Sequence, residues 1–126
     1  MTSDQPLLLP NEPSRFEPRH IDDLLVFAHE HEASDVTIQT DASIIAEIHG
    51  RLHTISRRRL SNAEVGDLLN AIYGPNGTTQ LMRGEDLDTH YEVRPNRNQR
   101  FRHRVNAVGC HVDGHEGIQI TIRTIP

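Results

Sequence analysis

Apolar residues recur along the chain at two spacings, one typical of helices and the other typical of strands. A helical face is predicted where they fall at i, i+3, i+4 and i+7, as in Ile21, Leu24, Leu25 and Ala28. Asp22 and Asp23 lie near the start of this segment, where negative charge favours the helix dipole. We therefore expect a first helix over about residues 19–31.

A second helix is predicted by its start and stop signals as well as by its apolar spacing. Ser61 and Glu64 have the spacing of a capping box, in which each side chain accepts a hydrogen bond from the backbone of the other residue. Gly74 and the proline after it end the helix. A short third helix is expected over residues 78–83.

Strands are predicted where apolar and polar residues alternate. Residues 35–40 alternate in this way and include β-branched side chains, and two further strands flank a turn at Gly50. The predicted strands are 35–40, 44–48, 52–55, 88–94, 100–112 and 117–125. One helix, three strands, two helices and three strands, in that order, predict an α+β fold with a mostly antiparallel sheet of about six strands and packed helices.

The length of 126 residues suits one domain with a modest core. Residues 1–17 are rich in proline and polar side chains, so we expect a flexible N-terminal arm there and the folded domain over 18–126. No apolar run approaches the roughly 18 residues of a membrane span, and the first ten residues lack the regions of a secretory signal. With a single cysteine, Cys110, the chain is predicted to be cytoplasmic and without direct membrane insertion.

The charged residues exclude several functions. All thirteen basic residues are arginine, so the chain lacks the lysine that a Walker A loop or a Schiff-base enzyme requires. The net charge of -5 argues against a nucleic-acid partner. The nine histidines lack the spacing of a metal site, and Cys110 lies in an alternating strand without a nucleophile motif. We therefore expect no metal site and no catalytic residue in this chain.

Arginines at alternate positions form the most informative motif. Arg100, Arg102 and Arg104 would share one face of a strand, with neighbours about 7 Å apart. Such a ladder suits phosphates or an acidic protein surface, because a guanidinium group offers two donors to each anion. Asp88 and Glu92 alternate on the preceding strand and could pair with the ladder across a hairpin instead. Spacing alone favours this pairing and leaves both interpretations open.

Four segments of the chain carry motifs in a recognisable order. They are residues 33–38 (Ala-Ser-Asp-Val-Thr-Ile), 88–92 (Asp-Thr-His-Tyr-Glu), 102–106 (Arg-His-Arg-Val-Asn) and 122–126 (Ile-Arg-Thr-Ile-Pro). They resemble Ala-Ser-Asp-Leu-His-Ile, an acidic strand, Arg-Phe-Arg-Val-Asn and Phe-Arg-Thr-Ile-Pro in the N-terminal domain of PilT/DotB-like secretion ATPases. The resemblance extends from about Ile21 to Pro126 and is strongest to the type IVB secretion and plasmid-conjugation branch. Thr37 stands where the family has histidine and Glu47 where pilus members have arginine, so no role is carried over to either residue.

The resemblance implies a PAS-like domain that belongs to a larger ATPase. In that family the domain packs on a RecA-like ATPase domain of the same or a neighbouring subunit in a homohexamer, beside the inner-membrane secretion machinery. The arginines that would reach ATP, bound with Mg²⁺ in the full-length parent, are Arg104 and Arg123, with Arg102 as a weaker third. The family's Walker A loop follows Thr-Ile-Pro, so we expect an ATPase domain after residue 126 in the parent. This chain would then be a regulatory and oligomerisation domain that neither hydrolyses ATP nor binds it tightly.

Two other functions use the same predicted elements. A stand-alone PAS-like sensory module would bind a small ligand, but two tyrosines and three phenylalanines are little material for an aromatic-lined pocket. A nucleic-acid binder would use the arginine ladder, but that face lacks stacking aromatic residues. The small-ligand sensor is therefore the main alternative to the ATPase domain.

Overall fold

Residues 7–126 are described by a computed structural model of the chain. They form α1 (His20–Glu30), β1 (Ala33–Gln39), β2 (Ile45–Ile48), β3 (Arg51–Thr54), α2 (Asn62–Tyr73), α3 (Gly77–Met82), β4 (Leu87–Asn96), β5 (Gln99–Val112) and β6 (His115–Ile125). Each predicted helix and strand is present, with ends that differ by one or two residues. The predicted α+β, PAS-like fold class is confirmed. Among the helices of residues 7–126, none has the length and apolar composition that crossing a bilayer requires.

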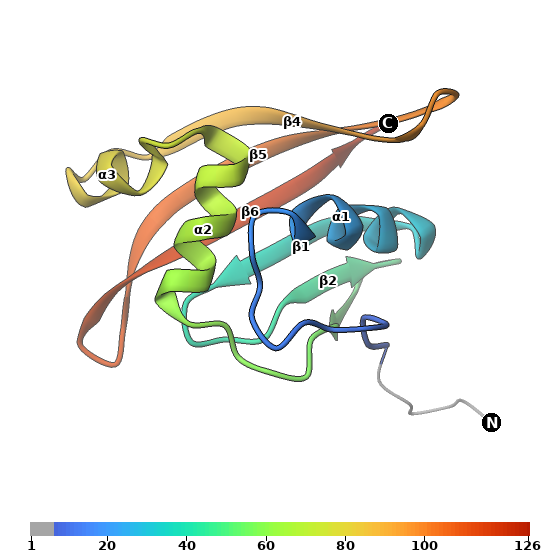
Figure 1. The fold of residues 1–126 in the computed structure, drawn as a ribbon. Helices are drawn as coiled ribbons and strands as arrows, with labels where there is room; N and C mark the ends of the chain where they lie inside the picture. The colour runs from blue at the N-terminus through green and yellow to red at the C-terminus, as the bar shows by residue number, and fades with distance from the viewer. Residues whose placement is uncertain (1–6) are drawn as a thin grey trace.

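The six strands form one open antiparallel sheet in the order β3-β2-β1-β6-β5-β4. β5 and β6 make a long hairpin in which Arg104 lies opposite Arg123. β6 also pairs with β1, and this pairing places Asp35 opposite Arg123. Three of the four segments that carried the resemblance, 33–38, 102–106 and 122–126, therefore lie side by side in the centre of the sheet (Figure 1).

Alternation along the strands gives the sheet one apolar and one polar face. α1 and α2 lie on the apolar face, and no helix of residues 7–126 lies on the other (Figure 1). The central strands and the two helices supply many of the deeply buried core side chains, among them Ile38, Ile120, Ile122, Leu24, Leu25, Leu68 and Leu69. Full burial of such a side chain stabilises the fold by about 1.5–3 kcal/mol. The opposite, uncovered face is where a binding surface can form.

α2 begins at the predicted capping box. The Ser61 hydroxyl accepts from the Glu64 backbone at 3.2 Å, and the Glu64 carboxylate accepts from the Ser61 backbone at 2.9 Å. The helix ends at Gly74, whose φ of +127° is strained for a residue with a Cβ atom. Local sequence signals thus set both ends of α2.

Residues 7–17, which we call the N-terminal strap, lie along the domain. Leu9 and Phe16 are buried in the core, and the Leu9 backbone N–H donates to the Ile55 carbonyl at 2.8 Å. The structure therefore differs from the flexible arm that we expected over residues 1–17, because two apolar side chains among the prolines gain burial by packing. Residues 1–6 of that expected arm lie outside the described residues.

Candidate functional site

The uncovered face of the sheet brings the three predicted site arginines together. Arg104 of β5 and Arg123 of β6 are cross-strand neighbours, and Arg102 lies two residues from Arg104 on the same strand. The alternation that buries His103 and Val105 turns Arg102 and Arg104 to the opposite, solvent side. All three arginines are exposed. We call Arg102, Arg104 and Arg123 the arginine face.

Two of these arginines are already held by carboxylates. Arg123 Nε donates to Asp35 Oδ1 at 2.9 Å, and Arg104 Nη2 donates to Asp88 Oδ2 at 3.2 Å. Within residues 7–126, no carboxylate lies within the 4.0 Å ion-pair distance of Arg102. The arginine face therefore combines two neutralised guanidinium groups with one that has no ion-pair partner in the described chain.

The cross-strand pairing that the sequence left open is present in part. Arg104 pairs with Asp88, and Glu92 contacts Arg94 at 2.7 Å and Arg100 at 3.4 Å. The pKa of the exposed Glu92 is held below its usual value, mainly by the hydrogen bond from Arg94 and also by the charges of Arg94, Arg100 and Arg102. The ladder thus pairs within its hairpin at both ends, but the pairing does not reach Arg102.

A row of charged residues in register crosses five strands of the sheet. Glu47 lies opposite Asp35, which lies opposite Arg123, followed by Arg104 and His90. The row is acidic on β1 and β2 and basic on β5 and β6. An anion that binds this face must therefore compete with a carboxylate at Arg123 and Arg104, because each guanidinium group already donates to one.

Sequence reasoning missed Asp35 as a partner of Arg123. Asp35 was visible as a polar residue in an alternating strand, and its side chain is only 18% exposed whereas that of Arg123 is 72% exposed. The hydrogen bond from Arg123 to Asp35 raises the pKa of the arginine further. No signal along the chain could have identified the pair, because the register between β1 and β6 is a long-range property.

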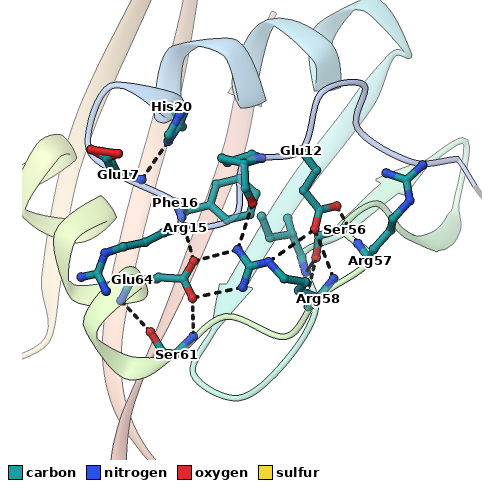
Figure 2. Close-up of polar contacts among 12 residues, drawn as sticks. Glu12, Arg15, Phe16, Glu17, His20, Ser56, Arg57, Arg58, Ser61 and Glu64 are labelled. Atoms are coloured by element: carbon teal, nitrogen blue, oxygen red, sulfur yellow. Dashed lines mark hydrogen bonds and ion pairs between the residues drawn. The ribbon is translucent and has the colours of Figure 1, made fainter.

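A second polar cluster lies beneath the strap at the start of α2 (Figure 2). Glu64 is 4% exposed and accepts from the Phe16 backbone at 2.7 Å and from Arg58 Nη2 at 2.9 Å, in addition to Ser61. Burial raises the pKa of Glu64, but the hydrogen bonds from Arg58, Ser61 and Phe16 outweigh it and lower the pKa to about 2. Glu64 is therefore a buried, ionised carboxylate that ties the strap to α2.

Glu12 and Arg58 complete this cluster from the strap and from the loop before α2. Glu12 accepts from the backbone N–H groups of Arg57 at 2.7 Å and Arg58 at 3.2 Å. Arg58 Nη2 also donates to the Pro13 carbonyl at 3.2 Å, and its guanidinium lies 5.7 Å from the centre of the Phe16 ring. Arg58 Nε is buried without a hydrogen-bond partner among residues 7–126, at 3.9 Å from Glu12. The cluster therefore ties the strap to α2 and to the loop before it.

His103 lies on the opposite side of β5 from the arginine face. It is buried, and its Nδ1 is 3.3 Å from the Tyr91 carbonyl. Burial lowers the pKa of His103, and nearby His29 lowers it further, while the contact with Tyr91 opposes the change. His29 stacks on Phe101 with ring centres 3.6 Å apart. These contacts join α1 to the β4–β5 hairpin.

Two surface hollows of the described chain are notable, and neither is lined by an arginine-face residue. The larger, of about 470 Å³, lies between α2, α3 and the end of the β5–β6 hairpin, and the smaller, of about 240 Å³, lies between the strap and α1. Within residues 7–126, no three His, Cys, Asp or Glu side chains come close enough to hold a metal ion. The arginine face is thus separate from both hollows.

Comparison with known proteins gives matches among solved structures. No protein-family model and no curated protein matches the chain. The X-ray structure of the Legionella pneumophila ATPase DotB is 59% identical with a TM-score of 0.94, covering 98% of this chain and 33% of that one. For the Yersinia pseudotuberculosis ATPase DotB the identity is 30%, the TM-score 0.86 and the coverage 99% and 36%.

The pilus retraction motor PilT with bound ADP shares the fold. It is 21% identical with a TM-score of 0.62, and the match covers 84% of this chain and 29% of that one. The chain therefore spans about a third of the length of each of these proteins. The family inferred from the motifs is confirmed, and the chain matches the N-terminal domain of a PilT/DotB-like secretion ATPase.

Proposed function

We propose that this chain is the regulatory and oligomerisation domain of a hexameric ATPase of type IVB secretion or plasmid conjugation. The parent protein would bind ATP with Mg²⁺, hydrolyse it, and work in the cytoplasm beside the inner-membrane secretion machinery. The domain would pack on a RecA-like domain of the same or a neighbouring subunit. The similarity to the ATPase DotB, and to PilT with bound ADP, supports this proposal.

The arginine face is the observation that carries the proposal. Arg102, Arg104 and Arg123 are exposed on adjacent strands of a face that no helix of residues 7–126 covers. Guanidinium groups suit phosphate oxygens because their donors form a planar fork. In the proposed complex, these arginines contribute positive charge to the ATP site at the boundary with the RecA-like domain.

The ion pairs on this face are compatible with an exchange of partners. Arg104 and Asp88 are 64% and 57% exposed in their side chains, and an exposed pair of this kind contributes about 0–1 kcal/mol. Arg123 is 72% exposed, but its partner Asp35 is only 18% exposed. A polyphosphate carries several charges and has more acceptor oxygens than one carboxylate. Phosphate can therefore replace Asp88 at low cost, and Arg102 has no ion-pair partner in residues 7–126 to give up.

The chain by itself is expected neither to hydrolyse ATP nor to bind it tightly. Without any lysine it cannot form a Walker A loop, which supplies the backbone cradle and the lysine that hold the phosphates. Turnover by the purified chain that survives a mock-purification control would contradict this expectation.

The test of the arginine face uses the full-length parent. Arg104→Ala, Arg104→Lys and Arg123→Ala are compared with the wild type in steady-state ATP hydrolysis, and Arg19→Ala serves as a control because Arg19 is exposed directly before α1. We expect the alanine variants to lose activity on the order of tenfold or more, with poor rescue by lysine, which provides a point charge without the fork. Unchanged turnover in all three variants would refute the phosphate role, and the pairs with Asp35 and Asp88 would then be scaffold.

A further inference from the structure

The larger surface hollow lies on the side of the sheet opposite to the arginine face. The β5–β6 hairpin extends past α2 there, and α3 lies beside it (Figure 1). Gly109 and Ile118, opposite each other in the hairpin, line the hollow together with Ala63 and Gly66 of α2. The small side chains on this lining leave about 470 Å³ of space.

Met82 lies at the end of α3 and lines this hollow. Its side chain is 80% exposed, and within residues 7–126 the only other large apolar residue that is strongly exposed is Leu52, on β3 at the edge of the sheet. Methionine is common at protein-binding surfaces because its flexible thioether adapts to different partners. An exposed methionine beside a hollow therefore favours contact with another protein.

The charged residues in and beside the hollow indicate what kind of partner it would bind. Asp67 and Glu116 line the hollow, and Glu85 and Asp86 follow directly on Gly84, which also lines it. No arginine belongs to the lining. Within residues 7–126, Glu116, Glu85 and Asp86 make no ion pair, so their charges are available to an incoming cation.

Two arginines near the hollow reduce this negative charge without cancelling it. Arg15 of the strap contacts Asp67 at 3.3 Å, but both side chains are about half exposed. Arg83 is exposed directly after Met82, and His111 lies opposite Glu116 in the hairpin. Of the two carboxylates that line the hollow, only Asp67 has an ion-pair partner within residues 7–126, so Glu116 leaves the hollow complementary to a cation.

We propose that this hollow is a docking site for a segment of another protein that carries an apolar side chain next to an arginine or lysine. The apolar side chain would pack on Met82 and Leu81, and the cation would pair with Glu116 and Asp67. A small organic ligand fits less well, because no phenylalanine, tyrosine or tryptophan lines the hollow. This surface needs no nucleotide and lies apart from the arginine face.

The NMR signal of the Met82 methyl group can show whether a peptide binds at the hollow. The chain has two methionines, so labelling their methyl groups with carbon-13 gives one reporter at Met82 and one reference at Met1. The probe is a short helical peptide with leucine and arginine four positions apart, compared with peptides in which glutamate replaces arginine or alanine replaces leucine. We expect the first peptide to shift the Met82 signal, and to bind roughly fivefold or more tightly than either control peptide.

Matched variants test whether the lining selects the peptide, with affinity measured from the fluorescence anisotropy of labelled peptide. Met82→Ala is compared with Leu52→Ala, and Glu116→Gln with Glu30→Gln, since all four positions are exposed and should fold normally. We expect only Met82→Ala and Glu116→Gln to weaken binding, each by roughly fivefold. Equal binding of the glutamate peptide, an unmoved Met82 signal, or equal losses in the two control variants would overturn the proposal.

Discussion

The polar cluster around Glu64 beneath the strap and the arginine face both pair arginine with carboxylate, but only the Glu64 cluster belongs to the core. Glu64 is 4% exposed and is bonded by two backbone N–H groups as well as by Arg58. Arg123 on the arginine face is 72% exposed and, within residues 7–126, donates to Asp35 alone. Removing one partner of a buried pair costs about 3–5 kcal/mol, whereas an exposed pair contributes about 0–1 kcal/mol.

This contrast shows how one chemical pair can serve stability in one place and binding in another. The Glu64 carboxylate is held by two backbone N–H groups and shielded from water, so breaking the cluster leaves a charge unpaired inside the protein. On the arginine face water replaces any lost partner, so the guanidinium groups can exchange one anion for another at little cost. Four predictions test this difference, from the largest expected effect to the smallest.

Glu64→Ala should cause the largest loss of stability. The change removes the capping box of α2, the acceptor of the Phe16 backbone and the main partner of Arg58. We expect the free energy of unfolding in urea to fall by about 3–5 kcal/mol, with the strap exchanging its amide hydrogens faster. The exposed Glu30→Ala is the control, and a loss below about 1 kcal/mol for Glu64→Ala would show that the cluster is not a core element.

Acid should weaken the same cluster over a defined pH range. The pKa of Glu64 is lowered from 4.5 to about 2 in the fold, so the native state favours the ionised carboxylate. Its contribution, of about 3 kcal/mol, is present above pH 4.5 and is lost as the pH falls toward 2. Urea unfolding followed from pH 6 to 2 should show a steep loss in the wild type and a flatter profile in Glu64→Gln. Parallel profiles would contradict the assignment.

His103 should make a smaller, separate contribution near neutral pH. Its pKa is lowered by burial, so the native state favours the neutral ring, and stability is full above the ordinary value of 6.5 and falls as the pH drops below it. His29 and the Tyr91 carbonyl are the nearby groups that modify this titration. His103→Phe should remove the slope between pH 7 and 5 in thermal melts, and an unchanged slope would assign it to another group.

The arginine face should show the smallest effect on stability. Arg123→Ala, Asp35→Asn and the double variant form a cycle whose coupling energy we expect to be at most about 1 kcal/mol in chemical unfolding of this chain. The physical reason is that the Arg123 guanidinium is mostly hydrated in the fold. A coupling above about 2 kcal/mol would make the pair a structural one and would weaken the case for anion exchange on this face.

Most secondary structure was predictable, because its signals lie within a few residues of each other. The capping box at Ser61 and Glu64 and the glycine after α2 mark the ends of one helix. Alternation in β5 correctly placed Arg102 and Arg104 on one face and His103 on the other. The family was also predictable, since its motifs are short stretches that can be compared directly.

The strap shows where composition was a poor guide. Three prolines among polar residues favoured an arm without fixed contacts over residues 1–17, yet Leu9 and Phe16 are buried and Glu12 bonds the backbone before α2. Proline sets the local backbone conformation but does not prevent a segment from packing. Whether two apolar side chains are buried depends on a surface that the rest of the chain builds.

The sequence by itself determined the order of helices and strands, the side of each strand on which each side chain lies, and the exclusion of a Walker A loop. The tertiary structure alone decided that β6 pairs with β1, that Asp35 lies opposite Arg123, and that Glu64 meets Arg58 and Phe16. Periodicity and capping act between near neighbours, so they can be read along the chain. Strand register and burial depend on the simultaneous packing of distant segments, and no local pattern contains that information.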